Sequence, residues 1–90
     1  MTAERVDRIR QRLITALEPE ALDVIDESNL HVGHPGARDG RGHFRVRIRS
    51  RHFAGRPRLA RHRLIFDALA GMMETDIHAL AIEAESENED

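Results

Sequence analysis

The sequence contains no cysteine, no lysine, no tryptophan and no tyrosine among its 90 residues. Without cysteine, the chain forms no disulfide, offers no thiol nucleophile and cannot bind zinc through thiolates. Without lysine, Schiff-base chemistry and a phosphate-binding loop that relies on lysine are excluded as well. The aromatic residues are three phenylalanines, so the core must be built mainly from aliphatic residues and methionine.

Long apolar segments are also missing. The chain has no run of about 18 apolar residues that could cross a membrane, and its N-terminal segment lacks the apolar region of a secretory signal. We therefore expect a cytoplasmic protein that makes no membrane contact. A chain of 90 residues has room for one compact domain. We expect this domain to span residues 1–82, followed by an acidic, disordered tail over residues 83–90.

The formal net charge of −2 hides a strong separation of charge along the chain. Residues 38–63 hold ten arginines and a single acid, Asp39, whereas residues 74–90 hold seven acids and no base. Such a basic segment is typical of a surface that binds phosphate or an acidic partner. A solvated face balanced by the acidic tail explains the same pattern, and both interpretations stay open.

Apolar spacing predicts two helices. The first begins at Thr2, which can cap it, and ends before Pro19. Its apolar residues recur at helical spacing on one face: Val6, Ile9, Leu13 and Leu17. The second helix runs from about Pro57 to Met72, with Gly71 weakening its last turn. One stripe of the second helix holds His62, Ile65, Phe66, Leu69, Met72 and Met73.

Three segments have the pattern of β-strands. Residues 21–26 are short and partly β-branched. In residues 43–50 apolar side chains alternate with arginines, which places one face on the core and the other in solvent. Residues 77–82 are apolar on both faces, as expected for a strand flanked by other elements. The helix between the second and third strands permits these two to pair in parallel, and the glycine-rich residues 27–42 predict a long loop.

Four short motifs follow one another along residues 4–82. They are Asp26-Glu27-Ser28 followed by His31; Gly42-His43-Phe44-Arg45-Val46; Ser50 with Phe53-x-Gly55 and Arg61-His62-Arg63; and Ile77-His78-Ala79-Leu80. In this order, and with these elements between them, the motifs resemble the BolA family. The resemblance implies an α+β fold of the class II KH-like type, in which an α-β-β-α-β chain packs its helices on a mixed three-stranded sheet.

The resemblance also implies a function. BolA-like proteins bind monothiol glutaredoxins and share a [2Fe–2S] cluster with them, to which the glutaredoxin and glutathione supply thiolates. The BolA-like protein supplies one C-terminal histidine and a histidine or cysteine from a loop. By position in the motifs, the C-terminal ligand is His78. Counted from Ser28, the loop ligand is His31, our first choice; counted back from His43, it lies nearer His34, our second.

Imidazole chemistry agrees with this assignment. Histidine replaces cysteine on one iron of a [2Fe–2S] cluster in Rieske centres. A chain without cysteine can complete such a cluster only through histidine. Neutral imidazole ligands should raise the reduction potential and make the complex labile in acid, since a protonated histidine cannot bind iron.

The remaining histidines carry no predicted activity. His62 lies on the apolar stripe of the second helix and is expected to pack there, while His43 and His52 are expected at the surface or at a strand edge. The two serines of the motifs have no nucleophile elbow around them, and no carboxylate pair has a partner base. We therefore expect no enzymatic activity.

A second function is open, because some BolA-like proteins act as transcriptional regulators and the fold resembles KH domains. The basic segment would then contact the phosphates of duplex DNA, which arginine can bind in bidentate fashion. The expected contacts are three arginines of the second strand and four around the start of the second helix: Arg45, Arg47, Arg49, Arg56, Arg58, Arg61 and Arg63. For the apo form we expect a monomer or a weak homodimer.

Overall fold

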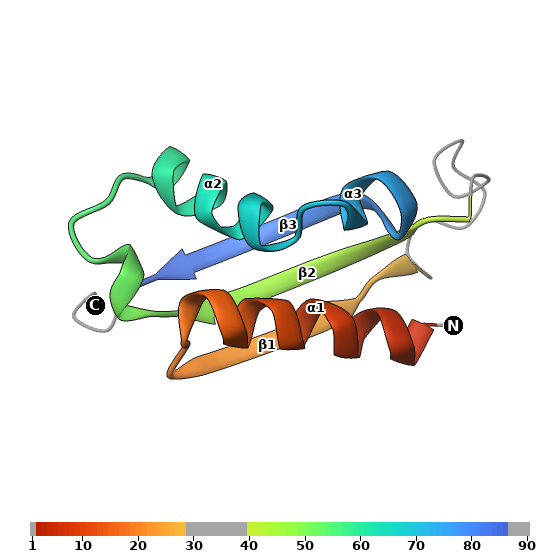
Figure 1. The fold of residues 1–90 in the computed structure, drawn as a ribbon, viewed down its shortest axis with the longest axis horizontal. Coiled ribbons are helices and arrows are strands. Elements are labelled where there is room, and N and C mark those ends of the chain that lie inside the picture. The colour runs from red at the N-terminus through yellow and green to blue at the C-terminus, as the bar shows by residue number, and fades with distance from the viewer. Residues whose placement is uncertain (1, 29–39, 87–90) are drawn as a thin grey trace.

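The computed structural model describes residues 2–28 and 40–86, and Figure 1 shows how their elements are arranged. In chain order these are α1 (Thr2–Leu17), β1 (Ala21–Asp26), β2 (Gly42–Arg49), the short 3-10 helix η3 (Arg51–Phe53), α2 (Arg58–Ala68), α3 (Met72–Thr75) and β3 (Ile77–Glu85). The predicted α+β fold is confirmed, with α3 as an additional short helix. Among the residues described, no helix is both long and apolar enough to cross a membrane.

The three strands form one sheet in the order β1-β2-β3. β1 pairs antiparallel with β2, with Val24 opposite Val46. β2 pairs in parallel with β3, and the register shifts between Gly42 and His43. β2 is therefore the central strand, and the sheet is mixed, as predicted.

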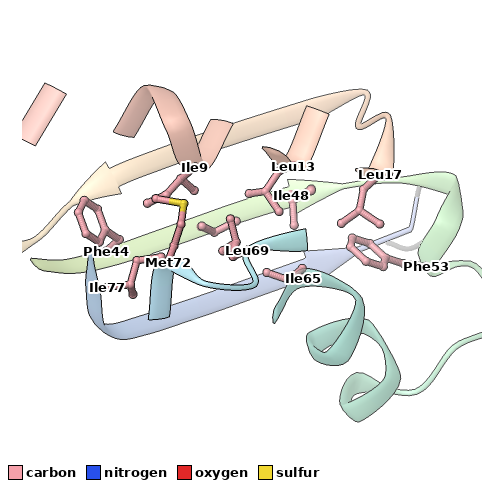
Figure 2. Close-up of a cluster of buried hydrophobic side chains, with 11 residues drawn as sticks. Ile9, Leu13, Leu17, Phe44, Ile48, Phe53, Ile65, Leu69, Met72 and Ile77 are labelled. Atoms are coloured by element: carbon pink, nitrogen blue, oxygen red, sulfur yellow. The ribbon is translucent and has the colours of Figure 1, made fainter. Parts of the chain in front are cut away.

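The helices cover one face of this sheet, and apolar side chains fill the space between them (Figure 2). The predicted stripe of α1 is confirmed, as is the alternation of β2, which buries every second residue because successive strand side chains point to opposite faces. Burying one large apolar side chain stabilises the fold by about 1.5–3 kcal/mol. The cluster comprises Ile9, Leu13, Leu17, Phe44, Val46, Ile48, Phe53, Ile65, Leu69, Met72 and Ile77.

The prediction of a single helix over residues 57–72 is wrong at its C-terminal end, where the structure has two separate helices, α2 and α3. Between them Gly71 has a φ of 89°, a left-handed conformation that glycine adopts without strain. Phe66, predicted on the buried stripe, is 38% exposed, whereas Ile65 and Leu69 are fully buried. Ile65 and Leu69 stand four apart on the face towards the core, whereas Phe66 directly follows Ile65 and points away from the middle of that face.

β3 continues past its predicted end. The sequence predicts a strand that stops at Ile82, but the strand reaches Glu85. Pairing explains the extension, because the parallel register continues until Glu85 stands beside Arg49. Residues 83–85 thus belong to the sheet rather than to a tail, and residues 87–90 of the predicted tail lie outside the described residues.

A buried carboxylate ties α1 to the junction between α3 and β3. Asp76 is 8% exposed, and it accepts hydrogen bonds from Arg5 Nε at 3.2 Å, from Arg8, and from Thr75 Oγ1 at 2.7 Å. Burial alone would raise the pKa of Asp76, but the hydrogen bonds from Thr75 and Arg8 and the charge of Arg8 outweigh it and lower the pKa. Its backbone carbonyl accepts from the amide of Gly42 at 2.9 Å, so the same residue also fixes the start of β2.

We expect Asp76→Asn to lower the free energy of unfolding by about 1–3 kcal/mol, because two arginines lose a charged acceptor. Since folding lowers the pKa of Asp76, its carboxylate stabilises the fold above the pKa of the unfolded chain. That contribution is lost as the pH falls through the folded pKa. Urea unfolding should therefore separate the variant from the wild type at neutral pH and bring them together in acid. Asp67→Asn, at an exposed position of α2, is the control, and equal losses from both substitutions would contradict the assignment.

Candidate functional site

His78 lies near the start of β3, at the end of the sheet where β1 stops and β2 and β3 begin (Figure 1). The preceding residue, Ile77, is fully buried in the core. The register shift of β3 lies at this point, because Gly42 pairs with Ile77 whereas His43 pairs with Ala79. His78 is the extra residue between these two pairs, where regular alternation is interrupted, and its side chain is exposed. Its Nδ1 lies 3.1 Å from Nη2 of Arg41. The predicted C-terminal ligand thus faces the surface.

A second imidazole lies against His78. The ring centroids of His43 and His78 are 5.2 Å apart, and the ring planes are inclined by 51°. His43 is only 8% exposed, so the prediction that it is an ordinary surface or edge residue is wrong. The reason is that β2 is central: the amide of Glu27 donates to the carbonyl of His43 at 2.8 Å on one side, and β3 flanks His43 on the other.

The long loop begins beside these two rings. The amide of Ser28 donates to Asp26 Oδ1 at 2.7 Å, and Ser28 Oγ accepts from the amide of His43 at 3.1 Å. The Asp26-Glu27-Ser28 motif therefore closes the chain onto the first residues of β2. The predicted loop ligands His31 and His34 lie outside the described residues. The structure locates Ser28, the last described residue before the segment that carries them.

Gly42 is required by close packing at the same place. A Cβ at this position would lie 2.7 Å from Cε2 of Phe44 and 3.0 Å from Oγ of Ser28. Any larger residue must therefore displace the aromatic ring, the serine or both. Because Phe44 belongs to the core, this glycine makes the position of Ser28 depend on the packing of the core.

The described residues contain no group of three or more His, Cys, Asp or Glu side chains that could hold a metal ion. They provide an exposed imidazole, a ligand type that suits iron, zinc and copper. A chain without cysteine adds no thiolate to this set. These donors fit a metal centre whose remaining ligands come from another molecule.

The arginines of β2 are occupied by carboxylates. They lie on the face of the sheet opposite the core, as the alternation predicted. Their ion pairs are Arg45 Nε with Glu27 at 2.9 Å, Arg47 Nε with Glu83 at 3.0 Å and Arg49 Nη2 with Glu85 at 3.0 Å. Ion pairs at a protein surface contribute little to stability, because water and salt screen them. Together, however, the glutamates of neighbouring segments neutralise a row that is strongly basic in the sequence.

The arginines around the start of α2 are arranged differently. Within the part of the chain that the structure describes, Arg56, Arg58 and Arg63 form no ion pair. Arg61 donates from Nη1 to a backbone carbonyl of β3 at 3.0 Å. A groove of about 670 Å³ lies between this helix start and the C-terminal half of β3, with Arg56, Arg58 and Arg61 on one side and glutamates on the other. The first turn of α2 carries no acid, so the helix dipole adds to the positive charge.

The sequence model of BolA-like proteins matches residues 13–89. The chain belongs to the BolA family. The solved structure of the BolA domain of SufE1 from Arabidopsis thaliana has the same fold, with a TM-score of 0.81 and 40% identity, and the match covers 92% of each chain. The family inferred from the four motifs is thereby confirmed, and with it the predicted fold.

Relatives within the BolA family differ in how much of their length this chain covers. A Sinorhizobium sp. protein, "Uncharacterized protein in cobS 5'region", is 49% identical over 86% of this chain and 85% of its own length. The Escherichia coli protein named "DNA-binding transcriptional regulator BolA" is 40% identical over 84% of this chain and 70% of its own length. The chain spans only 53% of human BolA-like protein 1 and 23% of SufE-like protein 1 from Arabidopsis thaliana. The BolA domain is therefore only part of those longer proteins.

Two side chains of this BolA site were not predicted. The sequence drew attention to His43, because it stands in the Gly42-His43-Phe44 motif. Its burial could not be read from that motif, because it depends on the strands on both sides. Nothing in the sequence pointed to Arg41, because its partner His78 lies 37 residues further along the chain. Only the folded sheet brings them together.

We expect Gly42→Ala to lower the free energy of unfolding by about 1–3 kcal/mol, the usual cost of overpacking. Phe44→Leu removes the ring atoms that the new methyl group would meet. Gly42→Ala should therefore cost less in the Phe44→Leu background than in the wild type, as measured by urea unfolding in a double-mutant cycle. Strictly additive losses would show that the contact between these two positions is not what requires glycine.

Proposed function

We propose that this protein is an adaptor that binds a monothiol glutaredoxin and completes a shared [2Fe–2S] cluster through histidine, in iron–sulfur trafficking or iron regulation. The observation that carries the proposal is the exposed imidazole of His78 at the end of the sheet where the loop with His31 and His34 begins. Membership in the BolA family supports it, since the resemblance to that family implies the same role. An adaptor of this kind works in the cytoplasm and needs no catalytic residue of its own.

Covalent geometry supports a second ligand from the loop. Ser28 is anchored on His43, whose ring centroid lies 5.2 Å from that of His78. Three residues of extended chain span at most about 10–11 Å, so the backbone of position 31 can be no farther than that from Ser28. His31 remains the first choice because it needs less chain than His34.

The division of ligands follows from the side chains available. A [2Fe–2S] cluster, when bound, supplies an electron-accepting iron centre that takes imidazole in place of thiolate, as in Rieske centres. His78 would donate one nitrogen lone pair, and the loop histidine a second. Glutaredoxin and glutathione would supply the thiolates that this chain lacks. The complex therefore requires both proteins.

Replacing His78 tests the ligand assignment. We expect His78→Ala to bind a cluster-loaded monothiol glutaredoxin with glutathione at least about tenfold more weakly. It should also lose the change in visible circular dichroism that histidine ligation produces. His52→Ala is the matched control, because His52 lies in η3 at the opposite end of β2. An unchanged spectrum and affinity for His78→Ala would show that His78 is not a ligand.

Replacing the loop histidines one at a time identifies the second ligand. We expect His31→Ala to weaken the same complex by about the same factor as His78→Ala, while His34→Ala behaves as the wild type. The readout is again visible circular dichroism in a titration with loaded glutaredoxin. Loss of the signal only in His34→Ala would assign the second ligand to that residue instead.

A second candidate function is binding to the backbone of duplex DNA by the arginines at the start of α2. The groove there favours it, because Arg56 and Arg58 line it without an ion pair among the described residues. The Escherichia coli relative is itself named a DNA-binding transcriptional regulator. The arginines of β2 would contribute less, since glutamates already hold them. Few aromatic residues are present for stacking on single-stranded bases.

Salt dependence tests this second function. Each neutralised phosphate contributes about −0.9 to the slope of log affinity against log salt. If Arg56, Arg58 and Arg63 each neutralise one phosphate, the slope should be near −3. We expect Arg58→Ala to reduce the magnitude of the slope by about 1, and Arg47→Ala, whose guanidinium is held by Glu83, to leave it unchanged. The measurement is fluorescence anisotropy with a labelled duplex. A salt-independent affinity, or equal effects of the two substitutions, would argue against these contacts.

A further inference from the structure

Arg41 makes a two-pronged contact beside the proposed ligand. Its Nη1 donates to the backbone carbonyl of Met73 at 2.9 Å, and its Nη2 lies 3.1 Å from Nδ1 of His78. Arg41 is half-buried and immediately precedes β2. The guanidinium thus connects the start of β2 to α3 and to β3.

The direction of the contact with His78 follows from the chemistry of the two groups. A guanidinium has five N–H donors and no acceptor, and it stays protonated in proteins. Nδ1 of His78 must therefore accept the hydrogen bond, so its lone pair points at Arg41. A neutral imidazole has one donor and one acceptor nitrogen, which places the proton on Nε2.

In this arrangement neither ring nitrogen of His78 presents a lone pair to a metal. The lone pair of Nδ1 is engaged by Arg41, and Nε2 carries a hydrogen. Moving that hydrogen to Nδ1 would open Nε2, but it would set an N–H group against the N–H of Arg41. Ligation through either nitrogen of the neutral ring therefore requires the guanidinium to withdraw.

We propose that Arg41 is a positioning residue that keeps His78 in a non-ligating state in the free protein and must leave Nδ1 before His78 binds iron. The inference rests on the proposed function for the identity of the metal centre. The carbonyl of Met73 gives the guanidinium a second anchor, so Nη2 can leave Nδ1 of His78 while Nη1 keeps its hydrogen bond to Met73. The ring of His43 supports the imidazole from another side.

A purely structural role for Arg41 leads to a different expectation. If the guanidinium only connected α3 to β3, its removal would loosen the site and weaken every complex formed there. Competition for Nδ1 instead predicts that removal of Arg41 strengthens ligation by His78. The sign of the change therefore separates the two roles.

The first measurement uses the apo protein. Long-range nitrogen–proton NMR correlations should show the His78 ring with an unprotonated, hydrogen-bonded Nδ1 and a protonated Nε2. In Arg41→Ala and in Arg41→Met, which keeps an apolar stem, the Nδ1 resonance should shift to the position of a nitrogen without a donor. The ring resonances of His62 on α2 should not move. A proton on Nδ1 in the wild type, or an unshifted resonance in both variants, would overturn the inference.

The second measurement titrates each variant with cluster-loaded monothiol glutaredoxin and glutathione, followed by visible circular dichroism. High ionic strength screens the loss of one positive charge. We expect the Arg41 variants to bind about threefold to tenfold more tightly, the range for one hydrogen bond that must break on binding. Arg51→Ala, at an exposed position of η3 beyond the opposite end of β2, also removes one positive charge; it is the matched control and should bind as the wild type.

Unchanged or weaker binding by folded Arg41 variants would overturn the inference. If Arg41→Ala proves unstable, Arg41→Met decides alone. If the wild type forms no complex with glutaredoxin, the proposed function fails separately. The NMR measurement then still decides whether Arg41 occupies Nδ1 of His78.

Discussion

The parallel register between β2 and β3 fixes where the candidate functional groups lie. It sets Arg47 beside Glu83 on the outer face of the sheet, and it brings the start of β3 against the start of β2, where the rings of His78 and His43 meet. A shift of one residue would turn the apolar side chains of β2 away from the helices. The core, the ion pairs and the imidazole contact thus depend on one strand pairing, whose first residue is held by the carbonyl of Asp76.

Local patterns in the sequence predicted those features of the fold that depend on a single segment. The stripe of α1 and the alternation of β2 need only the spacing of apolar residues within one segment, and the order of four motifs predicted the family. The same motifs placed His78 near the start of the third strand, which is where the structure has it. The partners of the β2 arginines could not be predicted: Glu27 reaches Arg45 from the residue after β1 and Glu83 from β3, and the sequence does not align these segments. The left-handed turn at Gly71 likewise becomes visible only in the backbone.

Charge along the sequence is a poor guide to charge on the surface of this fold. The ten arginines of residues 38–63 form one block in the chain. Those that the structure describes are distributed between positions held by carboxylates and positions without an ion pair among the described residues. The sheet supplies the counter-charges, since the acidic residues 83–85 extend β3 alongside β2. Part of the basic segment is therefore an internal electrostatic partner of the acidic C-terminal segment, and only the remainder is available to other molecules.

β3 connects the two ends of the domain. His78 stands near its first residue, while near its last the carbonyl of Ala84 is held by Arg61 at the groove. At roughly 3.3 Å per residue, the strand between them measures about 20 Å. No side chain extends across that distance, so ligands at the two ends would not touch each other. Under the proposed functions, the histidine site and the DNA-binding groove would therefore lie at opposite ends of one strand.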